Sequence, residues 1–368
     1  MTISFPRYGP RRMKFSFVVS SLAGGGAERM MLRLGSGLRR RGHEVSLIAL
    51  DPEVKHEVPP GLPVHVVHAR HGWLGTWLAG RALRALYRRL GLGADCVTVS
   101  TLPFADQVAA SARLPNLWCR ITNTLSAEVR QLERTSPRKA ARRLARYRRL
   151  YDGRNLVAVS EGVADDLKRA LGLKSARVVR IYNGYDVDAI RAAAREAEPD
   201  LPAEPFVLHV GRFMPQKRHD LLLDAFKQAG LAHKLVLLAE SSPELDSMLL
   251  KKQLGQQVMV AGFRRNPYPW MRAAELLVLS SDREGMPNVL VEALICGTRV
   301  VSTDCPSGPR EILKGELARG LVPTGDAAAL AAAMRAALAA PRPDASAVTA
   351  EFTQERMVSG YEALAGAA

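Results

Sequence analysis

The sequence has few cysteines and no long apolar run. Its four cysteines are Cys96, Cys119, Cys296 and Cys305, and no two of them form a Cys-x-x-Cys pair. This spacing excludes the usual disulfide framework and the usual zinc knuckle, and it fits a protein of a reducing compartment. No apolar run reaches the roughly 18 residues that a spanning helix requires, so we expect no segment of this chain to cross a bilayer.

The excess of basic over acidic residues is confined to one half of the chain. Of 368 residues, 52 are Lys or Arg and 36 are Asp or Glu, which gives a net charge of +16. Residues 1–200 hold 34 basic and 18 acidic side chains, whereas residues 201–368 hold 18 of each. The first half is therefore expected to lie near an anionic partner, such as nucleic acid, an anionic membrane face or a phosphorylated lipid.

Segments with strand and helix patterns alternate along the chain, which predicts parallel sheets covered by helices. The strands of the first cycle are expected at residues 14–20, 45–50, 64–67, 96–100, 117–121, 156–160 and 178–182. An acidic, proline-containing linker follows, and a second cycle begins with a strand at 206–210. The expected fold is α/β, with two Rossmann-like, doubly wound domains at residues 13–186 and 187–349 facing a cleft. Ligands bind such sheets at the carboxyl ends of the strands.

The first strand-to-helix turn contains Gly24, Gly25 and Gly26. Glycines at this place let an anion approach the free amides of a helix N-terminus, although a tight turn alone would also explain them. The turn does not fit the dinucleotide fingerprint, because Arg29 stands at the third glycine position.

Two cations follow the first strand of the second domain. Arg212 comes directly after it and Lys217 five residues later. Arginine offers a planar fork and lysine a point charge to phosphate oxygens, so the pair suits a phosphate, unless both are simply solvated.

Residues 284–292 contain two glutamates around the start of a helix. Glu284 precedes that helix and Glu292 lies about one turn inside it. Free amides at the helix start suit a diphosphate, and the two carboxylates suit sugar or ribose hydroxyls. Taken alone, the same residues could instead stabilise the helix dipole.

Glu284 and Glu292 form an E-x7-E pattern. Together with the Gly-Arg…Lys segment at residues 211–217, this pattern resembles the retaining glycosyltransferases of family 4, which have the GT-B fold. Further matching segments lie at residues 24–29, 159–163, 181–186 and 305–311. The last of these resembles a subgroup that extends bacterial surface glycans.

The resemblance implies catalytic roles for three charged residues. Arg212 and Lys217 would neutralise the diphosphate of a nucleotide sugar in place of a metal ion. Glu284 would hold hydroxyls of the donor sugar, helped by the amides of Gly285 and Met286. The implied enzyme needs no metal and no cofactor besides its nucleotide-sugar co-substrate.

The resemblance also implies how the nucleotide binds. Glu292 would hold the ribose hydroxyls, and the amides of Asn288 and Val289 would face the phosphates. The base would stack near Gly262-Phe263-Arg264. The last helix, near residues 354–364, would cross back, so that residues 350–368 join the first domain.

Retention of the anomeric configuration is implied without a covalent carboxylate, since the departing phosphate would help to deprotonate the acceptor. Many relatives place a histidine in the loop that corresponds to residues 120–124, where this chain has Thr122. Either the subgroup works without an imidazole or Asn123 takes part of its role. Asp186 and Asp188 spell a DxD motif, but they stand at a helix start, where aspartate is favoured without a metal.

Basic residues gather in two stretches of the first half. Residues 129–151 combine helically spaced apolar side chains with many arginines, and Trp73 and Trp77 precede a second group of arginines. Such segments suit an anionic bilayer surface, unless they are the solvated faces of ordinary helices. We expect a peripheral enzyme on the cytoplasmic face of the plasma membrane, with a lipid-linked saccharide as acceptor. Nucleic acid is not expected, because no recognition helix, zinc finger or aromatic RNA-binding signature is present.

The expected donor is a UDP-activated hexose or N-acetylhexosamine. Two alternatives stay open: a GDP-mannose-dependent mannosyltransferase and a nucleotide-sugar epimerase of the same fold. The epimerase would need no lipid-facing basic surface, and the pairing of Glu284 and Glu292 with Arg212 and Lys217 argues against it.

Overall fold

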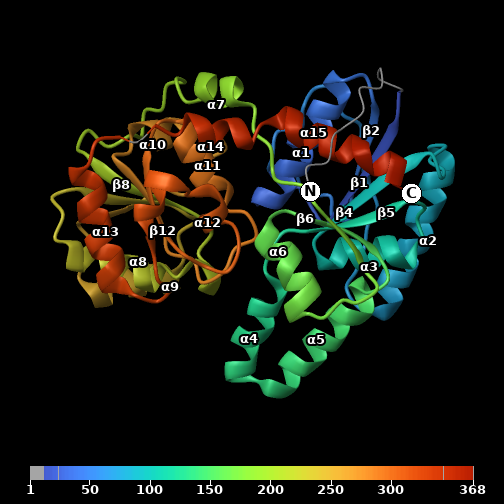
Figure 1. The fold of residues 1–368 in the computed structure, drawn as a ribbon, viewed down its shortest axis with the longest axis horizontal. Coiled ribbons are helices and arrows are strands. Elements are labelled where there is room, and N and C mark those ends of the chain that lie inside the picture. Colours follow the sequence, from blue (N-terminus) through green and yellow to red (C-terminus); the bar gives the residue numbers. More distant parts are fainter. Residues whose placement is uncertain (1–11, 24, 343, 368) are drawn as a thin grey trace.

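The computed structural model describes residues 12–23, 25–342 and 344–367. Two α/β domains lie side by side, each built on a parallel sheet that helices cover (Figure 1). This arrangement confirms the fold class expected from the sequence. Within the described part of the chain, no helix combines the length and apolarity needed to cross a membrane.

The first sheet has seven strands in the order β3-β2-β1-β4-β5-β6-β7. These strands are β1 (Lys14–Val19), β2 (Glu44–Ala49), β3 (Val64–Val66), β4 (Cys96–Thr101), β5 (Leu117–Ile121), β6 (Asn155–Ala158) and β7 (Arg177–Arg180). All six residues of β4 are buried, as expected for a central strand with helices on both faces. The strand order reverses between β1 and β4, so the ligand-binding crevice of this domain lies beyond their carboxyl ends.

The second sheet has six strands in the order β10-β9-β8-β11-β12-β13. They are β8 (Phe206–Val210), β9 (Lys234–Leu238), β10 (Val258–Val260), β11 (Leu276–Leu279), β12 (Arg299–Thr303) and β13 (Leu321–Val322). Here the order reverses between β8 and β11. The loop after β8 carries Arg212 and Lys217, and the loop after β11 carries Glu284, so the fold brings these segments to one switch point.

Fifteen α-helices are seen in the described residues. They are α1 (Gly26–Arg40), α2 (Trp73–Arg89), α3 (Pro103–Ser111), α4 (Leu125–Thr135), α5 (Pro137–Tyr151), α6 (Glu161–Asp165), α7 (Val187–Ala193), α8 (His219–Ala229), α9 (Pro243–Lys252), α10 (Tyr268–Ala273), α11 (Asn288–Ile295), α12 (Pro309–Ile312), α13 (Ala327–Ala339), α14 (Ser346–Glu351) and α15 (Gln354–Glu362). The sequence pattern did not lead us to expect α3, α6, α12, α14 or β13.

The basic stretch at residues 129–151 is two helices and not one. α4 ends at Thr135, and α5 begins at Pro137 after an extended Ser136 with φ −157°. A proline disfavours helical backbone at the residue before it, which explains the break. α4 and α5 form a hairpin that projects from the first domain at the bottom of Figure 1.

The chain returns to the first domain at its end. α15 packs against α1, and Arg41 and Glu362 form an ion pair with 2.6 Å between nitrogen and oxygen. Tyr185 and Thr353 form an isolated parallel bridge where the two connections between the domains run together. The boundaries at residues 186/187 and 349/350 stay predictions.

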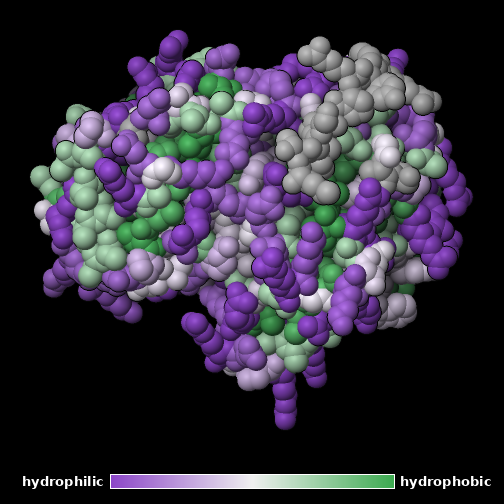
Figure 2. Space-filling model, viewed as in Figure 1, coloured by the Kyte–Doolittle hydropathy of each residue, from purple (hydrophilic) through white to green (hydrophobic). Residues whose placement is uncertain are grey.

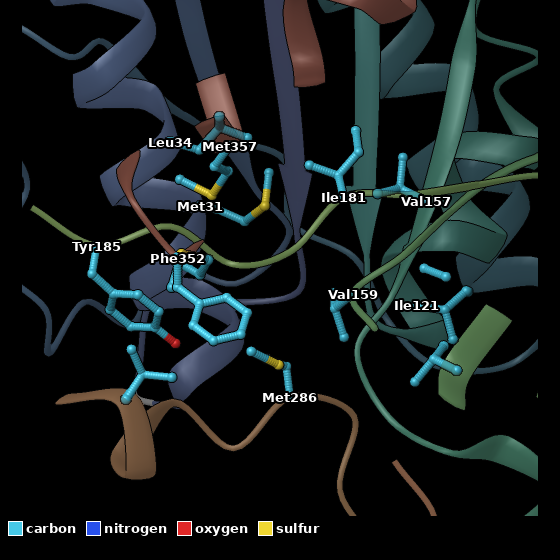
Figure 3. Packing of buried hydrophobic residues seen from close by; sticks show 14 of the residues in the cluster. Met31, Leu34, Ile121, Val157, Val159, Ile181, Tyr185, Met286, Phe352 and Met357 are labelled. Carbon is cyan, nitrogen blue, oxygen red and sulfur yellow. The ribbon is translucent and has the colours of Figure 1, made fainter. Parts of the chain in front are cut away.

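One apolar cluster extends over both domains (Figure 3). It includes Met31 of α1, Met286 of the second domain, and Tyr185 and Phe352 from the two connections. The side chain of Met286 is 5% exposed. Its side chain therefore belongs to the shared core, and its backbone amide is the group that remains for a ligand.

Candidate functional site

Two loops, one from each domain, contact each other at the centre of the cleft. Gly285 pairs with Asn123 in an antiparallel bridge, and a Cβ added at Gly285 would lie 2.1 Å from the carbonyl oxygen of Thr122. Thr124 donates to the carbonyl oxygen of Glu284 from its amide (3.1 Å) and from its hydroxyl (2.7 Å). The structure thus brings Thr122, Asn123, Glu284 and Gly285 together, and glycine is needed at 285 because backbone approaches so closely.

Glu284 is buried and oriented by two donors. Its Oε1 lies 2.6 Å from Nζ of Lys217 and accepts a 2.7 Å hydrogen bond from the hydroxyl of Ser281. Lys217 ends a 3-10 turn, Pro215–Lys217, which follows β8. The predicted sugar-holding carboxylate and one predicted phosphate cation are therefore a single ion pair, in which the lysine fixes the carboxylate.

Arg212 lies exposed on the loop after β8 and forms no ion pair with any described residue. Its charge acts on Glu28, a buried carboxyl in the first turn of α1. Burial raises the pKa of Glu28, while Arg212 and Arg120 act in the opposite direction. A free guanidinium thus faces the glycine loop of the first domain.

The glycine loop is held by close contacts. A Cβ at Gly25 would lie 2.5 Å from a carboxylate oxygen of Glu28, and the Gly25 amide donates to Nε2 of His56 at 3.2 Å. A Cβ at Gly26 would lie 2.7 Å from Nδ2 of Asn288. Gly24, the third glycine of the motif, lies outside the described residues.

Two helix N-termini meet at this loop. α1 begins at Gly26 and α11 at Asn288, and Nδ2 of Asn288 donates to the carbonyl oxygen of Gly26 at 3.2 Å. The Asn288 Oδ1 accepts from Nδ2 of Asn183 and from the hydroxyl of Tyr185, each at 2.7 Å. The first amides of a helix have no intrahelical partner and carry partial positive charge, so both helices favour an anion between them. The first residues of α11 are Asn288 and Val289, whose amides are the ones expected to face the phosphates.

Glu292 is paired across the cleft. Its Oε1 lies 2.7 Å from Nη2 of Arg33 on α1 and 3.2 Å from the hydroxyl of Tyr268 on α10. Arg33 also donates to the Tyr268 hydroxyl and lies over the Tyr185 ring. Arg33 and Tyr268 were not expected as site residues, because no local pattern links α1 to a carboxylate in the other domain.

A cleft of about 430 Å³ opens beside this group, which is a size suited to a small ligand. Its walls include Arg29 and Arg33 from α1 and Arg265 and Tyr268 from the second domain.

Residues 262–264, which were expected near the nucleotide base, differ from one another in their contacts. Gly262 has a left-handed backbone (φ 79°), and the ring of Phe263 is 41% exposed and available for stacking. Arg264 lies over the Trp270 ring and pairs with Asp200 at 2.8 Å. The Arg264 side chain is therefore held by the connection between the domains.

The DxD segment, Asp186 to Asp188, lies at the start of α7. The Asp186 carboxylate caps α7 by accepting from the amide of Ala189 at 3.1 Å, and it pairs with Arg40 at 3.2 Å. In the described part of the chain, no three His, Cys, Asp or Glu side chains come together as a metal would require.

A third contact across the cleft was not foreseen. Glu311 of α12 accepts from the amides of Glu161 and Gly162, at 2.7 and 2.9 Å, and from the hydroxyl of Tyr182 at 2.9 Å. A carboxylate of the second domain thus caps α6 of the first. This contact joins the three segments at residues 159–163, 181–186 and 305–311.

Comparisons with known proteins agree with this architecture. The protein-family model described as Glycosyltransferase Family 4 matches residues 24–189. The protein-family model described as Glycosyl transferases group 1 matches residues 204–340. The two models divide the chain between them, one for each domain.

Among curated relatives, an N-acetylgalactosamine-N,N'-diacetylbacillosaminyl-diphospho-undecaprenol 4-alpha-N-acetylgalactosaminyltransferase of Campylobacter jejuni is 28% identical over 312 residues, which cover 81% of this chain and 83% of that protein. The lipopolysaccharide 1,6-galactosyltransferase of Escherichia coli is 29% identical over 181 residues, or 47% of this chain and 49% of that protein. A crystal structure of Anabaena Alr3699/HepE in complex with UDP and glucose covers 97% of this chain and 100% of that chain, with a TM-score of 0.75 and 19% identity. The chain belongs to the family 4 glycosyltransferases and is a hexosyltransferase with the GT-B fold.

Proposed function

We propose that this enzyme transfers a hexose or N-acetylhexosamine from a UDP-sugar to a lipid-linked or surface-glycan saccharide, with retention of configuration and without a metal ion. The observation that carries the proposal is the Lys217–Glu284 ion pair at the junction of the two domains. It joins a group suited to sugar hydroxyls with a group suited to phosphate, at the place where the N-termini of α1 and α11 meet.

The leaving group of the reaction is a nucleoside diphosphate, on which negative charge grows as the glycosidic bond breaks. Arg212, Lys217 and the first amides of α11 are positioned to stabilise that charge. Preorganised donors of this kind usually contribute the largest share of catalysis. These cations would take the place of a metal ion, and the enzyme needs no further cofactor.

Glu284 would bind donor-sugar hydroxyls through the carboxylate that Lys217 and Ser281 hold in place. A nucleophilic role is not assigned to it, and the proposed reaction forms no covalent glycosyl-enzyme. The departing phosphate would instead help to deprotonate the acceptor on the same face of the sugar, which gives retention.

Asn123 does not replace an imidazole in this account. Its Nδ2 donates to Oε1 of Gln216 at 3.1 Å, and its Oδ1 accepts from the amide of Thr124 at 2.9 Å. The side-chain nitrogen thus joins the loop to the second domain, and the side-chain oxygen is used within the loop. The reaction is therefore proposed to proceed without a histidine at this place, with Thr122 in the corresponding position.

The substrate classes follow from chemistry and from relatives. The Campylobacter jejuni relative is named for a diphospho-undecaprenol acceptor, and the Escherichia coli relative for lipopolysaccharide. The Anabaena structure contains UDP and glucose. These names favour a UDP-sugar and a lipid-linked or surface-glycan acceptor over the two alternatives, GDP-mannose and epimerisation.

An anionic membrane face is the proposed partner of the basic first domain, and the cytoplasmic face of the plasma membrane the proposed location. Six cations of α5 are exposed: Arg138, Lys139, Arg142, Arg146, Arg148 and Arg149. Arg143 is not among them, because it pairs with Glu128 of α4. Figure 2 shows long hydrophilic side chains projecting where Figure 1 places the α4–α5 hairpin. Cations close to an anionic bilayer contribute about 1 kcal/mol each.

The test is turnover of a panel of UDP- and GDP-sugars in EDTA, with and without a polyprenyl-diphosphate saccharide. Sugar transfer from a UDP-sugar that persists in EDTA and is lost in Glu284→Ala supports the proposal. Glu316→Ala is the matched control, since Glu316 is exposed and unpaired among the described residues. Turnover only with GDP-mannose, or epimerised donor without transfer, would establish one of the alternatives.

A further inference from the structure

A groove of about 600 Å³ lies between α2, α3 and α5 of the first domain. Figure 1 shows α2 and α3 on the side of the first sheet that is remote from the second domain. The groove is thus separate from the cleft that holds Glu284 and Glu292. Nothing in the proposed reaction uses it.

Several side chains that line the groove have hydrogen-bond donors without partners among the described residues. Arg146 and Arg149 line it and form no ion pair or side-chain hydrogen bond with any described residue. Arg154 also lines it and donates only its Nε, to the carbonyl oxygen of Leu150 at 2.7 Å. The Nε2 of Gln107 on α3 is buried and has no hydrogen-bond partner.

The start of α2 adds to this set. The helix begins after Gly72, with no side-chain cap and no acidic residue in its first turn, and both Gly72 and Trp73 line the groove. No aspartate or glutamate is part of the lining. Three guanidinium groups, a buried amide and a helix N-terminus with 17 residues behind it therefore face one space, which suits a phosphate.

The rim of the groove is apolar and exposed. Trp73 is 83% exposed, Leu74 50%, Trp77 47% and Leu78 53%. These four side chains belong to the first two turns of α2. Exposed apolar patches of this kind mark interaction sites, and tryptophan is favoured where an apolar phase meets water.

We propose that the groove binds the phosphate headgroup of an anionic bilayer lipid, while Trp73 and Trp77 enter the interface beside it. The inference rests on the proposed membrane-facing position of the first domain and assigns it a discrete lipid site. A free phosphate would explain the arginines but not the four exposed apolar side chains. A diffuse basic surface would explain neither the groove nor the unpaired side-chain nitrogen of Gln107.

The first test compares two double variants of the full chain. Arg146→Gln/Arg149→Gln removes two charges from the groove. Arg138→Gln/Arg142→Gln removes two exposed charges from the same helix outside it. Binding to phosphatidylcholine vesicles with and without phosphatidylglycerol is measured by sedimentation, in the absence of any nucleotide sugar. Thermal unfolding checks that each variant folds.

A discrete site predicts binding that depends on phosphatidylglycerol and weakens at least tenfold more in the groove variant than in the control, which loses only the general attraction of two cations to the bilayer. Equal weakening in both variants would show a diffuse attraction and overturn the proposal. Binding that requires added polyprenyl diphosphate, and ignores phosphatidylglycerol, would also overturn it.

Tryptophan fluorescence provides a second readout. Trp118 and Trp270 are fully buried, so a vesicle-induced change reports Trp73 and Trp77. We expect a blue shift and quenching by brominated lipid. Saturation by inorganic phosphate or diphosphate, with no shift on vesicles, would contradict the lipid assignment. Because neither readout needs catalysis, a protein that binds vesicles in this way but transfers no sugar would contradict only the proposed reaction.

Discussion

Arg33 and Glu292 form an ion pair across the cleft, with 2.7 Å between Nη2 and Oε1. Arg33 belongs to α1 of the first domain and Glu292 to α11 of the second, and both side chains are largely buried. The carboxylate proposed to hold the ribose is thus also a bond between the domains. The Glu292 side chain thus takes part both in the proposed nucleotide binding and in the contact between the domains.

Replacing Arg33 with methionine should destabilise the protein. The change leaves the Glu292 carboxylate buried without its cation, which typically costs about 3 kcal/mol of unfolding free energy. Urea unfolding of Arg33→Met, Glu292→Gln and the double variant measures this. We expect the double variant to lose at least about 1 kcal/mol less than the sum of the single variants. Strictly additive losses would show that the two residues do not interact in solution.

Removing the Lys217 charge should impair catalysis more than binding. Lys217→Met leaves Glu284 without its ion-pair partner and removes a cation from the proposed diphosphate site. Loss of one preorganised charge-stabilising group typically lowers kcat about 100- to 1000-fold. Lys251→Met is the control, because Lys251 is exposed and has no ion pair among the described residues. A Lys217 variant with nearly full kcat would remove this residue from the mechanism.

A methyl group at residue 285 should force the domains apart. In Gly285→Ala the new Cβ would lie 2.1 Å from the Thr122 carbonyl oxygen. Neither the Cβ nor the carbonyl group can move away by rotation of a side chain. Overpacking of this kind costs roughly 1–3 kcal/mol. We expect a lower Tm and at least tenfold lower transfer. In Gly255→Ala the Cβ would meet open space, so this variant serves as the control. Equal behaviour of the two variants would contradict the contact.

The free energy of unfolding should fall as the pH rises through the titration range of one buried carboxyl group. Burial raises the pKa of Asp106 from 3.8 to about 7, and its carboxyl contacts the hydroxyls of Ser100 and Tyr151 at 2.6 and 2.7 Å. Between pH 4 and 7 the folded protein therefore holds a proton that the unfolded chain has released. Stability contributed by that proton is lost over this window as the pH increases.

Asp106→Asn removes this titration. Relative to the natural protein, the variant should gain about 3 kcal/mol when the pH rises from 5 to 8, since each pKa unit corresponds to about 1.4 kcal/mol. Urea unfolding of both proteins at the two pH values measures the difference. An unchanged difference between the proteins at pH 5 and pH 8 would contradict a raised pKa for Asp106.

The fold could be predicted because its strands are apolar and its turns are marked. Strands such as Leu117–Ile121 and Phe206–Val210 have the expected bounds. Helix ends were less predictable, as at Gln253, whose left-handed backbone (φ 59°) ends α9 although no glycine marks the place. The short helix α12 has only four residues, so no periodicity could announce it.

The site was predictable where motifs are local. Glu284, Gly285 and the flanking segment do lie at the expected helix start, and Lys217 lies beside them. The pairing of Arg33 with Glu292 could not be predicted, because the two residues are 259 positions apart and only the domain packing joins them. The groove between α2, α3 and α5 could not be predicted either, because it exists only when the three helices are packed together.

One measurement tests both the metal independence of the transfer and the retention of configuration. The enzyme is incubated in EDTA with α-linked UDP-sugars and a polyprenyl-diphosphate saccharide, and the anomeric configuration of the new linkage is read by proton NMR. We expect an α-linked product at a rate that EDTA does not change. A β-linked product, or activity that returns only when a divalent metal is added, would overturn the proposed reaction.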